Sequence, residues 1–179
     1  MQREWLDRLP FDIYSVNVHT GAKRLIGRSY RTAPKWSVNG KWAVMYDPIA
    51  QVWNKFDGAT GKVVNISDAI GYPMFMESYD KPAPAPAYGI AGWTADGNNV
   101  FLYDAYDWWK IDLTGERQPE CLTKGYGRKH GKSIRKMTSN IDKDVFQKDE
   151  KVIVSLWDKD TMDEGVYQLD MKGRLRKLM

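Results

Sequence analysis

The side chains best suited to chemistry are concentrated in one short stretch near the middle of the chain. Six cationic residues and one histidine lie within thirteen positions, with Tyr126 among them: Lys124, Arg128, Lys129, His130, Lys132, Arg135 and Lys136. Side chains of this kind bind phosphates or acidic peptides through charge-assisted hydrogen bonds. A solvated loop that keeps a sheet edge soluble has the same composition, so both interpretations stay open. The candidate partner-binding residues are Arg128, Lys129, His130 and Lys132.

The same stretch contains Gly131-Lys132-Ser133, which resembles parts of two catalytic motifs. A phosphate-binding P-loop requires a glycine five residues before Gly131, but Tyr126 occupies that position. The nucleophile elbow Gly-x-Ser-x-Gly requires a second glycine where the chain has Arg135. The sequence therefore predicts neither nucleotide binding nor a nucleophilic serine, and we expect no enzymatic activity from this chain alone.

Carboxylates and metal-ligating residues do not form a recognisable site. Asp47, Asp104 and Asp158 recur at one position, directly after an aromatic residue that ends a β-rich run. An aspartate there accepts hydrogen bonds from nearby backbone N–H groups in a turn, so recurrence favours a structural role over a calcium site. His19, His130 and Cys121 do not have the spacing of a zinc site. We expect no metal and no other cofactor.

Composition indicates one soluble β-rich domain. The chain has 179 residues, of which 42% are hydrophobic and 28% charged, and this excludes a disordered tail, a collagen-like rod or a coiled coil. A net charge of only +4 gives no indication of a nucleic-acid partner. A single cysteine excludes an internal disulfide, and neither a membrane span nor a signal peptide is recognisable. The 8 Trp, 10 Tyr and 15 Gly favour strands joined by tight turns.

Repeats define the expected elements. Trp36-Ser37-Val38-Asn39-Gly40 and Trp93-Thr94-Ala95-Asp96-Gly97 open two similar units, and a degenerate third opening begins at Phe146. Asn-Gly and Asp-Gly pairs predict β-hairpins with type I′ turns. Turn glycines at 21, 61, 115 and 173 are spaced 40, 54 and 58 residues apart, and a four-stranded repeat of about 40 to 50 residues is typical of a β-propeller blade.

The predicted fold is all-β: a partial β-propeller of about three and a half four-stranded blades, forming an open arc. The blades are expected at approximately 11–27, 33–66, 88–123 and 133–178, with insertions at 67–87 and 124–132. The proline-rich stretch 81–86 should be an exposed extended connector, because proline removes backbone donors and fixes φ. Tyr14, Trp53, Trp109 and Tyr167 recur before the turn glycines, where we expect them to pack between blades.

These repeats resemble the propeller domain of the prolyl oligopeptidase family of serine peptidases, specifically its large bacterial members. The stretches that carry the resemblance are Asp12-Ile13-Tyr14 with Thr20-Gly21, the Trp36 opening, Tyr88 to Trp109, and Leu122 to Lys129. The resemblance implies that the propeller gates or orients peptides. It also implies that a separate α/β-hydrolase domain with a Ser-Asp-His triad lies outside this chain, and that the parent protein is exported or periplasmic.

The expected function is therefore that of a non-catalytic propeller module, whose partners are peptide substrates and the hydrolase domain of the parent protein. The alternative is a stand-alone propeller-type binding or scaffold module that completes its ring by self-association. A third possibility is an enzyme that uses the propeller face itself. By the strand count, an open arc leaves apolar blade faces exposed, so we expect the chain to self-associate when expressed alone.

Overall fold

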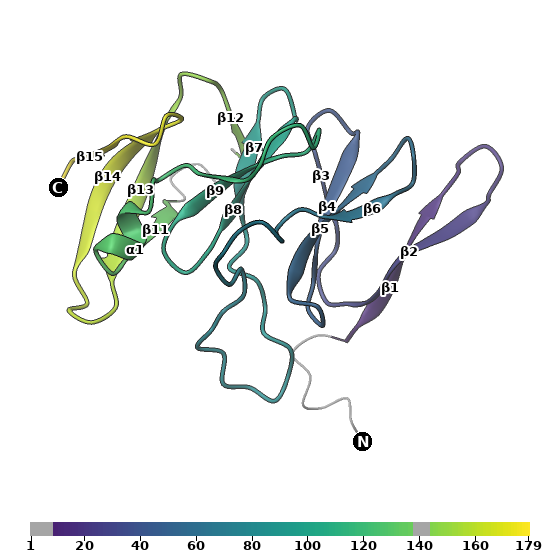
Figure 1. Ribbon diagram of the computed structural model, residues 1–179, viewed down its shortest axis with the longest axis horizontal. Coiled ribbons are helices and arrows are strands. Elements are labelled where there is room, and N and C mark those ends of the chain that lie inside the picture. The colour runs from purple at the N-terminus through teal and green to yellow at the C-terminus, as the bar shows by residue number, and fades with distance from the viewer. Residues whose placement is uncertain (1–8, 138–143) are drawn as a thin grey trace.

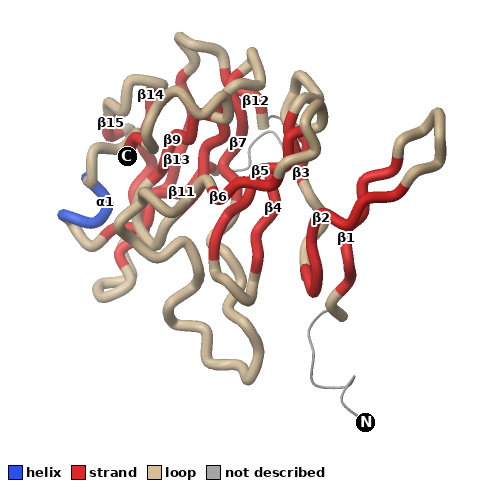
Figure 2. The backbone as a smooth tube through the Cα atoms, turned by 45° about the vertical axis from the view of Figure 1, so that its right-hand side comes forward, coloured by secondary structure: helices blue, strands red, loops and turns tan. Residues whose placement is uncertain are grey.

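The computed structural model describes residues 9–137 and 144–179, and nearly all of its regular structure is β-strand (Figure 1). The strands form four separate sheets that lie side by side, as Figures 1 and 2 show. None of the four sheets closes on itself. The all-β prediction is confirmed.

The first two sheets come from the first 65 residues. The first pairs β1 (Phe11–Val16) with β2 (Lys23–Tyr30) in antiparallel orientation. The second is an antiparallel meander in chain order, made of β3 (Lys35–Trp36), β4 (Trp42–Asp47), β5 (Val52–Asp57) and β6 (Val63–Asn65).

The third sheet has five strands, and the fourth has four. The third consists of β7 (Ile90–Thr94), β8 (Asn99–Tyr103), β9 (Trp108–Asp112) and β10 (Glu120–Cys121), with β12 (Val145–Phe146) parallel to β7. The fourth consists of β11 (Lys132–Lys136), β13 (Lys151–Asp158), β14 (Glu164–Asp170) and β15 (Leu175–Lys177). A four-residue helix, α1 (Tyr126–Lys129), lies in the predicted insertion 124–132, between β10 and β11.

Apolar side chains join neighbouring sheets face to face. Successive residues of a strand point to opposite faces, so a strand in a central sheet contributes to two clusters. In β4, Val44 and Tyr46 pack toward the third sheet, while Ala43 and Met45 pack toward the first. In β8, Leu102 joins the cluster shared with the second sheet. Its neighbour Phe101 joins the cluster shared with the fourth, and the central strands are therefore almost entirely apolar.

The fourth sheet has a different pattern, because a neighbouring sheet covers one of its faces. Val152, Val154 and Leu156 of β13 are buried, whereas the alternating residue Trp157 is 39% exposed. In the first sheet, Tyr14 is 53% exposed. The expectation that the repeated aromatics pack between sheets therefore holds for the buried Trp53 and is wrong for Tyr14.

The predicted hairpins form, but their turns are not of type I′. The N–H of Gly40 donates to the carbonyl of Ser37 (2.9 Å), and that of Gly97 donates to Thr94 (2.8 Å). Among the described residues, positive φ is found at the glycine of each pair, +68° and +70°, but not at Asn39 or Asp96. A type I′ turn needs positive φ at both central residues, so these loops are wider turns that end in a left-handed glycine.

The insertion 67–87 folds back onto the second sheet instead of forming only an exposed connector. The Tyr46 hydroxyl donates to the carbonyl of Ala85 (3.1 Å), and Ala85 is buried. Phe75 forms an isolated antiparallel bridge with Ala87. Pro82 and Pro86 are exposed as expected, but the backbone between them lies against the core.

The degenerate opening at Phe146 belongs to the third sheet. The N–H of Trp93 donates to the carbonyl of Asp144 (2.7 Å), which continues the pairing of β12 with β7. A Cβ at Gly92 would lie only 2.6 Å from that carbonyl oxygen, so glycine permits the close approach. The first strand of the fourth sheet is instead β11, which pairs with β13.

Candidate functional site

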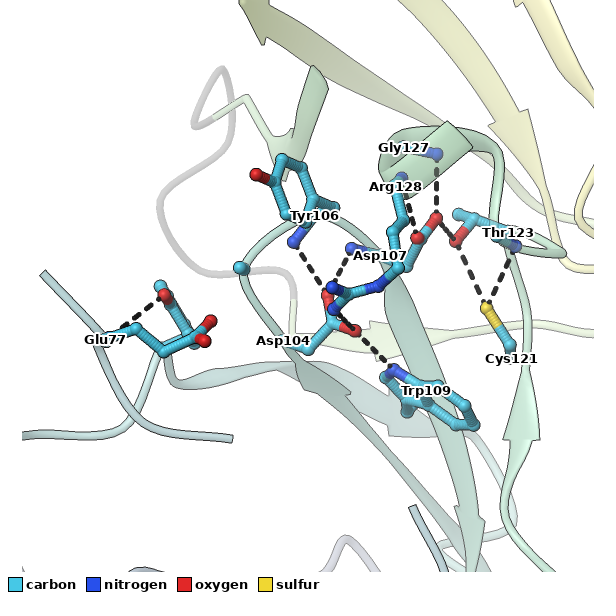
Figure 3. Close-up of polar contacts among 12 residues, drawn as sticks. Glu77, Asp104, Tyr106, Asp107, Trp109, Cys121, Thr123, Gly127 and Arg128 are labelled. Carbon is cyan, nitrogen blue, oxygen red and sulfur yellow. Dashed lines mark hydrogen bonds and ion pairs between the residues drawn. The ribbon is translucent and has the colours of Figure 1, made fainter. Parts of the chain in front are cut away.

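Two buried aspartates in the β8–β9 loop organise a polar cluster beside α1 (Figure 3). Asp104 accepts hydrogen bonds from the backbone N–H groups of Tyr106 (2.7 Å) and Asp107 (2.6 Å). The indole N–H of Trp109 donates to its other oxygen at 3.0 Å. Asp104 thus combines the predicted turn role with contacts to side chains.

Asp107 connects the same loop to α1. Its carboxylate accepts hydrogen bonds from the Thr123 hydroxyl (2.6 Å) and from the backbone N–H groups of Gly127 (2.9 Å) and Arg128 (3.0 Å). A Cβ at Gly127 would lie 2.6 Å from the carbonyl oxygen of Tyr106, so only glycine fits at this position. The short helix is therefore held in place by tertiary contacts rather than by its own length.

Arg128 uses its guanidinium inside the molecule. One Nη donates to Asp104 at 2.9 Å, and the guanidinium lies over the ring of Tyr72, with 3.8 Å from Cζ to the ring centroid. Burial opposes the charged form, but the hydrogen bond and the charge of Asp104 outweigh it and raise the pKa of Arg128. Because Tyr72 belongs to the insertion 67–87, Arg128 ties that insertion to the helix.

The other predicted partner-binding residues have different surroundings. Lys129 and His130 are exposed, and the centroids of the His130 and Tyr126 rings lie 4.4 Å apart. Lys132 pairs with Asp158 at 3.9 Å. Ser133, the residue closest to an elbow nucleophile, donates to the carbonyl of Ala105 at 2.6 Å. The structure therefore does not bring the four predicted residues together around one hollow.

The turn role predicted for the repeated aspartates is confirmed. Asp47 accepts hydrogen bonds from the N–H groups of Ile49 and Ala50, at 2.9 and 3.0 Å. Asp158 does the same for Asp160 and Thr161, at 3.0 and 3.2 Å. Within residues 9–137 and 144–179, no group of three or more His, Cys, Asp and Glu side chains is arranged to hold a metal ion.

A hollow of ligand size lies between the second and third sheets. It is a cavity of about 510 Å³, within the range of small-molecule and cofactor sites. Its walls combine apolar and aromatic side chains from both sheets and from the insertion 67–87, principally Val44, Tyr46, Trp53, Pro84, Ile90 and Trp93. Burial, with a smaller effect of the Asp47 charge, raises the pKa of Tyr46 to about 12, so this hydroxyl is a neutral donor at physiological pH.

Sequence reasoning missed the polar groups of this cavity. Arg31 and Thr32 line it from the segment that links the first and second sheets, and Lys35 lines it from β3. No ion pair involves Arg31 or Lys35 within the part of the chain that the structure describes. No motif in the sequence identifies these two cations, because they line a cavity only after distant segments of the chain have folded together.

Comparison of the chain with protein-family models and with curated proteins finds no match. No helix in the described part of the chain is long and apolar enough to cross a membrane.

Proposed function

We propose that this chain is an arc of β-propeller blades that binds and orients peptides for a serine peptidase domain located outside it. The observation that carries the proposal is the apolar cavity of about 510 Å³ between the second and third sheets. Peptide-orienting modules need such a hollow, with apolar walls and a few polar groups that fix the ligand.

The arrangement of the sheets supports the propeller interpretation. The second, third and fourth sheets each contain four antiparallel strands in chain order, and buried apolar clusters join each sheet to the next. Propeller blades are four-stranded sheets of this kind, arranged around a central channel that the first strand of each blade lines. The cavity is lined by Lys35 of β3, an edge strand of the second sheet, and by Asp144, directly before the edge strand β12 of the third sheet, as expected for a site that opens toward the channel.

The proposal is tested by filling the cavity. Ala33 is an exposed lining residue, so Ala33→Phe should obstruct the site and leave the core unchanged. The matched control is Ala59→Phe, an exposed alanine in the β5–β6 turn that does not line the cavity. The probe is an acetylated tetrapeptide that ends in Pro-Phe, and its binding is measured by calorimetry and by the total tryptophan fluorescence, to which Trp53 and Trp93 of the lining contribute.

We expect the peptide to bind the wild type and Ala59→Phe equally, and Ala33→Phe at least about tenfold more weakly, because a large side chain in a packed site excludes the ligand. Equal binding by all three proteins, or no binding by any, would overturn the proposal. The chain alone should hydrolyse no chromogenic peptide, and hydrolysis that survives both a serine-directed inhibitor and a Ser133→Ala substitution would reveal an unrecognised catalytic site.

A second candidate is the stand-alone binding or scaffold module that self-associates. Exposed apolar residues on the outermost sheets favour it: Tyr14 and Val16 of the first sheet are 53% and 50% exposed, and Trp157 of the fourth is 39% exposed. Sedimentation velocity at micromolar concentration tests it. Concentration-dependent oligomers that a Tyr14→Ser, Val16→Ser or Trp157→Ser substitution weakens would support this candidate, and a monomer at all concentrations would exclude it.

A further inference from the structure

The polar side of the cavity comes from one short segment of chain. Arg31, Thr32 and Lys35 all lie between the end of β2 and the end of β3, and all three line the cavity. They supply a guanidinium, a hydroxyl and an ammonium, which are all hydrogen-bond donors to an anion. The other lining residues are mainly aromatic, aliphatic and proline side chains.

The one acidic residue of the lining does not cancel this charge. Asp144 forms an ion pair with Lys136, so its negative charge is already balanced. Arg31 and Lys35 have no such ion pair within residues 9–137 and 144–179. Among the described lining residues, the cavity therefore has an excess of positive charge at one side.

A ligand that complements this lining has apolar groups and an anion at one end. Both cations lie within one short segment, so a single anionic group, such as the one at the end of a peptide, can interact with both. An arginine beside a hydroxyl and a lysine suits a carboxylate, which accepts charge-assisted hydrogen bonds from all three.

Building on the proposed function, we propose that the cavity recognises the free C-terminal carboxylate of an apolar peptide through Arg31, Thr32 and Lys35. Trp53, Trp93 and Tyr46 then contact the last apolar side chains of the peptide. The site selects for peptides that end within the cavity and against chains that continue through it.

The test compares two forms of one peptide. Acetyl-Ala-Phe-Pro-Phe is prepared with a free C-terminus and as its C-terminal amide, and calorimetry measures the affinity of each for the wild type. We expect the free acid to bind about tenfold more tightly than the amide, as for a charge-assisted hydrogen bond in a partly desolvated site. The difference should decrease as salt is raised, because screening weakens the attraction.

Single substitutions identify the residues responsible for the preference for the free acid. Arg31→Gln and Lys35→Gln should each reduce the affinity for the free acid toward that for the amide and leave the amide unchanged. The matched control, Lys62→Gln, removes one positive charge at an exposed position outside the cavity and should change neither affinity. Circular dichroism identifies any variant that fails to fold, and the acid-to-amide comparison in the wild type decides the question even then.

The outcomes separate the two proposals. If both peptides bind equally and Ala33→Phe abolishes the binding of both, the cavity binds peptides but the carboxylate inference is wrong. Equal loss of the acid preference in Lys62→Gln and in Arg31→Gln would also overturn it, because net charge would then be the cause. If neither peptide binds, the proposed function fails and this inference fails with it.

Discussion

The two long insertions lie at neighbouring junctions between sheets, and one fits closely while the other leaves a cavity. At the junction of the third and fourth sheets, the insertion 124–132 fits closely, because the buried carboxylate of Asp107 accepts two hydrogen bonds from the backbone of α1. At the junction of the second and third sheets, the insertion 67–87 is held by the Tyr46 hydroxyl and leaves a cavity of about 510 Å³. The first junction uses its polar groups for structure, while the second leaves Arg31 and Lys35 without an ion pair among the described residues.

A dense group of charges in the sequence is therefore not by itself evidence of a binding site. The densest basic stretch lies at the closely fitted junction, where Arg128 and Arg135 contact the backbone, carboxylates or aromatic rings of their own chain. Of the two cations that line a hollow, Arg31 comes from the connector between β2 and β3, and Lys35 comes from the two-residue strand β3. If the two junctions differ in this way, substitutions at the closely fitted one should cost more stability.

The largest effect is expected from Asp107→Asn. The substitution turns one carboxylate oxygen into an N–H donor, which then faces Gly127 N–H, Arg128 N–H or the Thr123 hydroxyl in a buried site. We expect the free energy of unfolding to fall by about 2 to 4 kcal/mol, since buried donors lose their acceptor. Urea denaturation measures this, and the exposed Asp149→Asn is the matched control, with less than about 0.5 kcal/mol expected. A loss below about 1 kcal/mol for Asp107→Asn would show that the fit of α1 does not depend on this carboxylate.

A smaller effect is expected from Arg128→Ala. It leaves the fully buried Asp104 without its cation and removes the contact with Tyr72, but the Arg128 side chain is 30% exposed, so water partly compensates. We expect a loss of about 1 to 2 kcal/mol in urea denaturation. Arg128→Lys should lie between this variant and the wild type, because an ammonium keeps the charge but not the flat stacking surface. If Arg128→Lys is as stable as the wild type, charge alone matters and the stacking on Tyr72 contributes nothing.

Tyr46→Phe probes the second junction. It removes the hydrogen bond to the Ala85 carbonyl and should cost about 1 kcal/mol at pH 7. Burial, and to a smaller degree Asp47, raises the pKa of Tyr46 from 10.0 to about 12. The unfolded chain therefore loses this proton more readily than the folded one, and the contribution of Tyr46 is fully present below pH 10.

The difference in stability between the wild type and Tyr46→Phe depends on pH. The stability advantage of the wild type over Tyr46→Phe should shrink as the pH rises from 10 toward 12. Comparing the two proteins at each pH cancels the titration of the other tyrosines. An advantage that grows in this range would mean that the Tyr46 hydroxyl is not desolvated.

The sheets were predictable from the sequence because the signals that define them are local. Trp36 to Gly40 and Trp93 to Gly97 encode hairpins within a few residues, and the repeated aspartates cap the next turn. The position of Phe146 was not predictable, because its pairing with β7 depends on the space that Gly92 leaves in another part of the chain.

The sites were less predictable because their contacts join distant segments. Asp107 reaches Gly127 across 20 positions, and sequence alone does not show that its loop and the insertion 124–132 meet. The cavity needs the connector around Arg31, the second sheet and the insertion together. The sequence pattern therefore groups Arg128, Lys129, His130 and Lys132, although their contacts in the folded chain differ.

The smallest effect separates the members of that group. Lys129 is exposed and has no ion pair within the described residues, so Lys129→Ala should change the free energy of unfolding by less than about 0.5 kcal/mol. Its neighbour in the helix, Arg128, is the internal comparison, since the two substitutions remove the same charge one residue apart. If partner binding does reside in this stretch, Lys129→Ala should weaken the binding of an acidic peptide without a loss of stability. Equal destabilisation by the two substitutions would contradict the contrast between the junctions, because the exposed lysine would then contribute as much to the fold as the arginine that holds Asp104.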